Sequence, residues 1–101
     1  MNIQIRAVGI PSSEALAEHI ERRIAFALSR FSDRLDRIRV RFSDLNGPKG
    51  GQDKVCQVDF RLKGLGPASV EARDADLYAA IDLAAAKAGR RAAHLLDRLK
   101  A

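Results

Sequence analysis

The chain has 101 residues, of which 47% are hydrophobic, so its composition excludes a disordered protein and its length allows one domain with a modest core. No apolar run approaches the roughly 20 residues that cross a bilayer, and Arg6 interrupts the first residues too early for a signal peptide. Eighteen Lys and Arg residues against 13 Asp and Glu residues give a net charge of +5, which favours a nucleic acid or another anionic surface as partner. We therefore expect a single cytoplasmic domain over residues 1–101, without a membrane partner.

The first two elements are predicted to be a strand and a helix. Apolar and polar residues alternate between Asn2 and Val8, which is typical of a strand with one buried face. Ser13 follows as an N-cap. Apolar residues then recur at helical spacing and predict a helix from about Ser13 to about Arg30: Leu16, Ile20, Ile24, Ala27 and Phe31.

Three more strands and a second helix are predicted in the rest of the chain. Residues 37–43, 56–62 and 68–73 alternate in the same way, and Gly- and Pro-containing segments at 46–51 and 64–67 separate them. Asp74 or Asp76 is expected to cap the last helix. Its apolar residues are Leu77, Ile81, Ala84, Ala88, Ala92, Leu95 and Leu99.

This order of elements predicts an α+β fold, a two-layer β-α-β-β-β-α sandwich. Each strand has one apolar face and each helix one apolar side, so a four-stranded sheet with both helices on one face buries them all. The first helix can serve as a right-handed crossover, which would make the first two strands parallel. The later strands follow one another through hairpins and should be antiparallel.

Basic residues gather on one flank of each predicted helix. The first helix carries His19, Arg22, Arg23, Phe26 and Arg30, and the last helix carries Lys87, Arg90, Arg91, His94 and Arg98 at the same offsets. Together they could form one continuous positive surface for RNA phosphates. The candidate RNA-binding residues are Arg22, Arg23, Arg30, Lys87, Arg90, Arg91 and Arg98. The alternative is that these are ordinary solvated helix faces with local salt bridges, such as Glu18 with Arg22.

The outer face of the sheet is a competing basic surface. Its outward positions are Gln4, Arg6, Arg37, Arg39, Arg41, Arg61 and Arg73, opposed by Asp59 and Glu71. Phe42 and Phe60 point to the core instead, so this face lacks the outward aromatics on which RNA bases stack. We rank it second, as a surface for backbone contacts.

Catalytic and metal-binding patterns are absent from the sequence. Neither His19 nor His94 belongs to a recognisable nucleophile motif, and there is no P-loop, dinucleotide fingerprint or zinc-ligand spacing. The single cysteine, Cys56, falls on the apolar side of a strand and is expected in the core. We expect no catalytic residues, no metal, no cofactor and no small-molecule substrate.

Two segments resemble a known family. The chain begins MNIQI before a Ser-capped helix, and Val70–Asp82 reads VEARDADLYAAID, with Lys87 and Arg91 after it. This is similar to the ribosome hibernation-promoting factor and ribosome-associated inhibitor A family, also called the sigma-54 modulation protein family, in its short form.

The resemblance implies a partner and a mechanism. It implies a fold related to the double-stranded-RNA-binding domain, and binding to 16S ribosomal RNA of the small ribosomal subunit in the channel used by mRNA and tRNA. Translation would be inhibited in stationary phase or stress by occupancy, without chemistry. Two alternatives stay open: a divergent paralogue that acts as a protein-binding regulatory adaptor, and a generic RNA-binding module.

Overall fold

The element order found in the structure is the predicted one. A computed structural model describes residues 1–45 and 53–100 of the chain. Its elements are β1 (Ile3–Val8), α1 (Glu14–Leu28), the 3-10 turn η1 (Ser29–Phe31), β2 (Leu35–Asp44), β3 (Lys54–Leu62), β4 (Gly66–Asp74) and α2 (Leu77–Lys100).

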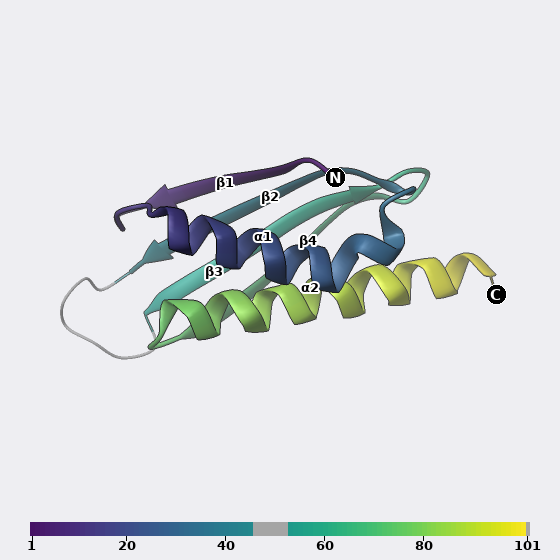
Figure 1. The fold of residues 1–101 in the computed structure, drawn as a ribbon. Helices are drawn as coiled ribbons and strands as arrows, with labels where there is room; N and C mark the ends of the chain where they lie inside the picture. Colours follow the sequence, from purple (N-terminus) through teal and green to yellow (C-terminus); the bar gives the residue numbers. More distant parts are fainter. Residues whose placement is uncertain (46–52, 101) are drawn as a thin grey trace.

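The four strands form one sheet in the order β1-β2-β3-β4. Strands β1 and β2 are parallel because α1 carries the chain back along the sheet between them, and β2, β3 and β4 are antiparallel neighbours. Both helices lie on the same face of the sheet, side by side, and leave the other face uncovered (Figure 1). The predicted two-layer α+β sandwich is confirmed.

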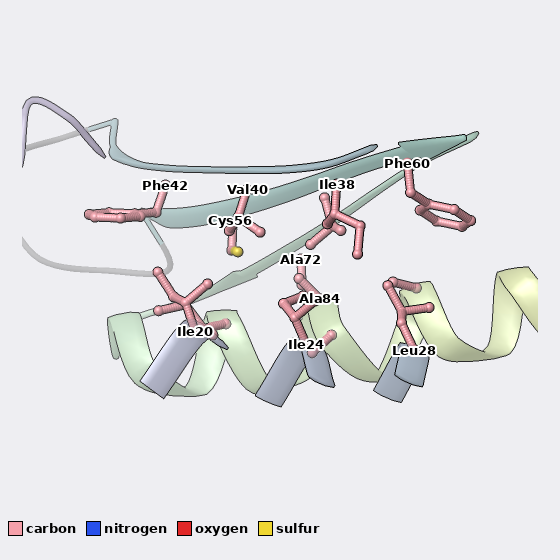
Figure 2. Close-up of a cluster of buried hydrophobic side chains, with 14 of the residues drawn as sticks. Ile20, Ile24, Leu28, Ile38, Val40, Phe42, Cys56, Phe60, Ala72 and Ala84 are labelled. Atoms are coloured by element: carbon pink, nitrogen blue, oxygen red, sulfur yellow. The ribbon is translucent and has the colours of Figure 1, made fainter. Parts of the chain in front are cut away.

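The core lies between the sheet and the two helices. The register places Val40 and Val58 opposite each other, so branched side chains form a row across the inner face. Ile20, Ile24 and Leu28 of α1 are fully buried and point towards this face in Figure 2. Helix α2 contributes mainly alanines to the core, and these small side chains let its backbone approach β3 and β4 closely.

Helix α2 also approaches α1 closely, at Gly89. A Cβ atom at this position would lie 3.1 Å from the carbonyl oxygen of Ala27 and 3.4 Å from its Cβ. Glycine costs about 1 kcal/mol of helix propensity relative to alanine. The sequence shows only that cost, whereas the structure shows that the absent side chain makes room for the neighbouring helix.

Element ends differ in detail from the sequence prediction. Helix α1 ends at Leu28, and a 3-10 turn completes the predicted segment. Strand β2 begins earlier than expected, at Leu35, with an irregular register before Ile38. Asp76 caps α2, because its Oδ1 accepts a hydrogen bond from the Tyr78 amide at 3.2 Å. The turn-rich segment predicted at 46–51 lies outside the described residues.

The apolar side of α2 was predicted one turn too long. Leu99 is 51% exposed, because the end of α2 runs past the sheet that would cover it (Figure 1). None of the helices in the described chain is both long enough and apolar enough to cross a membrane.

Candidate nucleic-acid interface

The outer surface of α1 presents a mixed basic and aromatic group. Arg22 is exposed, and Phe26, one turn further on, is 82% exposed although it is a large apolar side chain. The guanidinium of Arg23 lies 5.7 Å from the centre of the Phe26 ring, within the range of a cation–π contact. Arg22 and Phe26 lie outside the buried side of α1. That side consists of Leu16, Ile20, Ile24 and Leu28.

The two helices are joined by a polar cluster around Asp82 of α2. Its Oδ1 atom lies 2.7 Å from Nε2 of His19 and 3.2 Å from Nε of Arg23. The Arg23 Nε makes no hydrogen bond, so this contact is an ion pair only. The His19 ring also meets Tyr78 edge-to-face, with ring centres 4.8 Å apart. His19 and Arg23 therefore face α2 and share one carboxylate.

The basic flank of α2 lies mostly on the side of β4, away from α1. Lys87 donates a hydrogen bond of 2.8 Å from Nζ to the Glu71 carbonyl oxygen of β4. Arg91 follows Lys87 by one helical turn and occupies the same flank. Gly89 and Asp82, which contact α1, lie more than about 90° around the helix axis from Lys87.

The seven predicted binding residues thus divide into two that contact another residue of the protein and five that have no carboxylate partner. Arg23 is paired with Asp82, and Lys87 is anchored on β4. In the part of the chain that the structure describes, no carboxylate lies within ion-pair distance of the other five, which are all exposed: Arg22, Arg30, Arg90, Arg91 and Arg98. The Glu18–Arg22 bridge that the alternative interpretation offered is not formed. The outer surface of α1, η1 and α2, here called the helical face, is rich in arginine but also carries Asp82 between the helices and the exposed Glu18 and Glu21 of α1.

Arg30 lies at the end of the helical face nearest the C-terminus of α2. Its guanidinium lies 4.6 Å from the centre of the Phe31 ring. Both residues line a hollow with Ala93, Leu96 and Asp97 of α2. This stacking fixes the direction of a side chain that would otherwise move freely, and it keeps the charge at the surface.

The outer face of the sheet, here called the sheet face, carries the arginines that the alternation predicted. Arg6, Arg37, Arg39, Arg41, Arg61 and Arg73 are all exposed. Arg73 pairs with Glu71 at 3.3 Å. Asp59 accepts hydrogen bonds from Ser69 at 2.6 Å and from Gln57 at 3.0 Å.

Cys56 lies in the core, as its position on the strand predicted. Its side chain is fully buried, and burial raises the pKa of the thiol to about 12. The thiol is therefore protonated and unreactive at neutral pH. Among the described residues, no three His, Cys, Asp or Glu side chains are grouped in a way that could hold a metal ion.

The sequence could not show which basic residues of the helical face are paired with a carboxylate and which are not. Helical periodicity finds the basic flanks, but the pairing of His19 and Arg23 with Asp82 depends on how α1 and α2 are aligned. The only signal of this pairing in the sequence is Asp82, an acidic residue on the side of α2 that faces α1. It can be interpreted only once the two helices are known to be neighbours.

Comparison with known proteins supports the fold and identifies the family. The family described as Sigma 54 modulation protein / S30EA ribosomal protein matches residues 3–100. The crystal structure of the Thermus thermophilus Protein Y N-terminal domain superposes with a TM-score of 0.73 at 30% identity, covering 90% of this chain and 94% of that chain. A ribosomal subunit interface protein from Coxiella burnetii gives a TM-score of 0.72 at 26% identity, with coverage of 90% and 92%.

A search of curated proteins gives no match. The family match nevertheless covers almost the whole chain, and the solved structures share both its fold and its length. The chain therefore belongs to the sigma-54 modulation and S30EA ribosomal protein family, that of the hibernation-promoting factors.

Proposed function

We propose that this protein binds the small ribosomal subunit and inhibits translation by occupying the channel that mRNA and tRNA use. The relatives point to a ribosomal partner, since one is described as a ribosomal subunit interface protein. The observation that carries the proposal is the helical face, where five exposed residues have no described carboxylate partner: Arg22, Arg30, Arg90, Arg91 and Arg98.

Arginine suits this task for a physical reason. Its planar guanidinium donates two parallel hydrogen bonds to a phosphate and stays charged at every physiological pH. An arginine without a carboxylate at ion-pair distance loses no ion pair when it binds RNA. Helix contacts of this kind position the protein on the RNA backbone without reading the sequence.

The mechanism needs no catalytic step. A bound domain with extents of 47 × 24 × 18 Å excludes other macromolecules from the space that it fills. Inhibition by occupancy is then reversible and depends on affinity and concentration. It should weaken as salt rises, because counterions compete for the same phosphates.

The test is co-sedimentation with purified small ribosomal subunits across a salt series. The helical variant is Arg22→Gln/Arg90→Gln. The control variant, Arg34→Gln/Lys63→Gln, loses the same charge from exposed positions in the η1–β2 and β3–β4 connections. Arg23 is left intact because its ion pair with Asp82 would complicate the result.

We expect stoichiometric binding by the wild type that fades as salt rises. The log–log salt slope should fall by about 1.4 to 1.8 in the helical variant, since each lost phosphate contact removes about 0.7 to 0.9. The control should keep the wild-type slope. No wild-type binding at low salt would contradict a ribosomal partner, and an equal loss in the control would contradict the helical face.

A second measurement tests the channel itself. Bound protein should displace labelled mRNA and tRNA from small subunits in proportion to its occupancy. Stoichiometric binding with no displacement would place the protein elsewhere on the subunit.

A protein partner is the second candidate, and exposed apolar side chains on the helical face favour it. Phe26, Leu83 and Tyr78 are 82%, 46% and 40% exposed. A protein interface centred on them would depend little on salt and would lose most of its affinity in Phe26→Ala. Salt-insensitive binding to a protein, together with no binding to ribosomes, would favour this adaptor function.

A further inference from the structure

The uncovered sheet face brings arginines from two strands together. Strands β1 and β2 are parallel, and their register makes Arg6 and Arg41 direct neighbours. Adjacent strands are about 4.8 Å apart, so the two side chains leave the sheet next to each other. Like charges placed opposite each other in a sheet lower its stability. Folding alone therefore gives no reason for this pair.

Asp59 is the carboxylate beside these arginines, and it is hydrogen-bonded to other residues through Oδ1. Asp59 is the cross-strand partner of Arg39. Its Oδ1, however, accepts hydrogen bonds from Ser69 and Gln57, and so the carboxylate is held towards β4. In the described part of the chain, no carboxylate lies within 4.0 Å of a charged nitrogen of Arg6, Arg39 or Arg41.

Geometry makes the three arginines one site. Arg6, Arg39 and Arg41 line a shallow hollow on the sheet face, together with Gln4 and Asp59. Arg39 and Arg41 are two residues apart on β2, about 6.6 Å along the strand, which is close to the spacing of successive phosphates in an RNA strand. The Gln4 amide adds a neutral donor beside Arg39, its partner in the register.

The chemistry of the face favours an RNA backbone over RNA bases. Phe42 and Phe60 of the central strands are buried on the inner side. The hollow therefore offers three guanidinium groups, the Gln4 amide and one carboxylate, Asp59, but no ring on which a base could stack. A duplex, which presents phosphates and encloses its bases, suits such a surface.

We propose that Arg6, Arg39 and Arg41 form a second phosphate-backbone site, on the face opposite the helices. The protein then contacts two RNA segments at once, one through the helical face and one through the sheet face. That these segments are ribosomal rests on the proposed function, whereas the site itself does not.

The experiment uses a short RNA duplex as the probe and the helical variant Arg22→Gln/Arg90→Gln as the background. Arg6→Gln/Arg41→Gln is added to this background, and Arg34→Gln/Lys63→Gln is added separately as the matched loss of charge. Binding is measured by fluorescence anisotropy across a salt series. Nitrogen-15 spectra locate the contact through the arginine Nε–H signals.

We expect the background protein to bind the duplex and to show shifts at Arg6, Arg39 and Arg41. Adding Arg6→Gln/Arg41→Gln should lower the salt slope by about 1.4 to 1.8, and the control should not. Both added variants should stay folded, because glutamine relieves a like-charge contact and the control positions are exposed. Shifts confined to the helices, or equal losses in the two variants, would overturn the site. Tighter binding of an acidic peptide than of the duplex would overturn RNA as its ligand.

Small-subunit co-sedimentation separates this proposal from the proposed function. If wild type binds subunits and Arg6→Gln/Arg41→Gln keeps the affinity and salt slope of the control, the second site is overturned on the ribosome and the proposed function stands. If wild type binds no subunits but the duplex depends on Arg6 and Arg41, the site stands and the ribosomal partner falls.

Discussion

The Cys56 thiol makes the stability of this protein depend on pH in the alkaline range. Burial raises its pKa from an ordinary value of 9.0 to about 12, so the folded protein keeps the proton when the unfolded chain has lost it. The unfolded state binds fewer protons in this window, and stability must fall as pH rises. The contribution is complete below about pH 9 and is lost progressively towards pH 12.

We expect the difference in unfolding free energy between wild type and Cys56→Ala to stay constant below about pH 8 and to shrink above about pH 9. Denaturant titrations at several pH values measure it. Lys and Tyr also titrate in this pH range, but both proteins contain the same Lys and Tyr residues. Their effect on stability therefore cancels in the difference. A difference that stays constant to about pH 11 would contradict a buried, proton-retaining thiol.

If the helical face binds RNA, we expect Asp82 to control how much of Arg23 is available to it. The carboxylate lies 3.2 Å from Nε of Arg23 and is itself 41% exposed. In Asp82→Asn we expect tighter binding to small subunits and a salt slope larger by about 0.7 to 0.9, because Arg23 is released to contact a phosphate.

The same substitution should cost little stability, about 1 kcal/mol or less, because the ion pair is partly exposed and screened by solvent. Thermal unfolding provides that measurement. Arg23→Gln in the Asp82→Asn background is the control and should remove the gain. Weaker binding of Asp82→Asn than of wild type would show that Asp82 positions Arg23 instead of competing for it.

At the scale of elements, the contact between α1 and α2 depends on Gly89. Alanine there would gain about 1 kcal/mol of helix propensity but would press on the Ala27 carbonyl oxygen 3.1 Å away. These effects oppose each other, so the unfolding free energy of Gly89→Ala should stay within about 1 kcal/mol of the wild-type value. Gly89→Leu should lose about 1 to 3 kcal/mol by overpacking.

Denaturant unfolding of both variants tests this contact. Ala86→Leu is a suitable control, because Ala86 lies on the same helix and is only half-buried. Equal losses in Gly89→Leu and Ala86→Leu would mean that the close approach at Gly89 is not special.

Helices and strands were the level at which sequence reasoning worked best. Period-3.6 and period-2 patterns reflect burial of one face, and each element here has one buried face. The exceptions are at ends, where this signal fades: Leu99 fits the periodicity of α2 but lies beyond the sheet that would cover it.

At the scale of the whole molecule, the two basic faces lie on opposite sides of the sandwich. Effects of substitutions at distant sites without shared partners add. We therefore expect the losses of binding free energy of Arg22→Gln/Arg90→Gln and Arg6→Gln/Arg41→Gln on small subunits to sum in the fourfold variant. Co-sedimentation at one fixed salt concentration measures all three variants against wild type.

Additivity within about 0.5 kcal/mol would mean that the two faces contact RNA independently. A fourfold variant no weaker than the helical one would contradict simultaneous contact. The exposed double variant Arg34→Gln/Lys63→Gln, combined with the helical one, shows how much of any sum comes from net charge alone.

The sequence by itself determined the fold class, the order of elements, the buried side of each and the basic character of both outer surfaces. It could do so because these properties depend on near neighbours along the chain, through alternation, helical spacing and capping. The family resemblance carried by Val70–Asp82 belongs to this level too, and it is confirmed.

Only the tertiary structure decided which arginines are free and which are paired. Asp82 meets His19 and Arg23, Lys87 reaches the Glu71 carbonyl, and Arg6 stands beside Arg41. Each contact joins residues far apart in the sequence. Local periodicity has no information about interhelical alignment or strand register, which follow from how side chains of several elements fill one core.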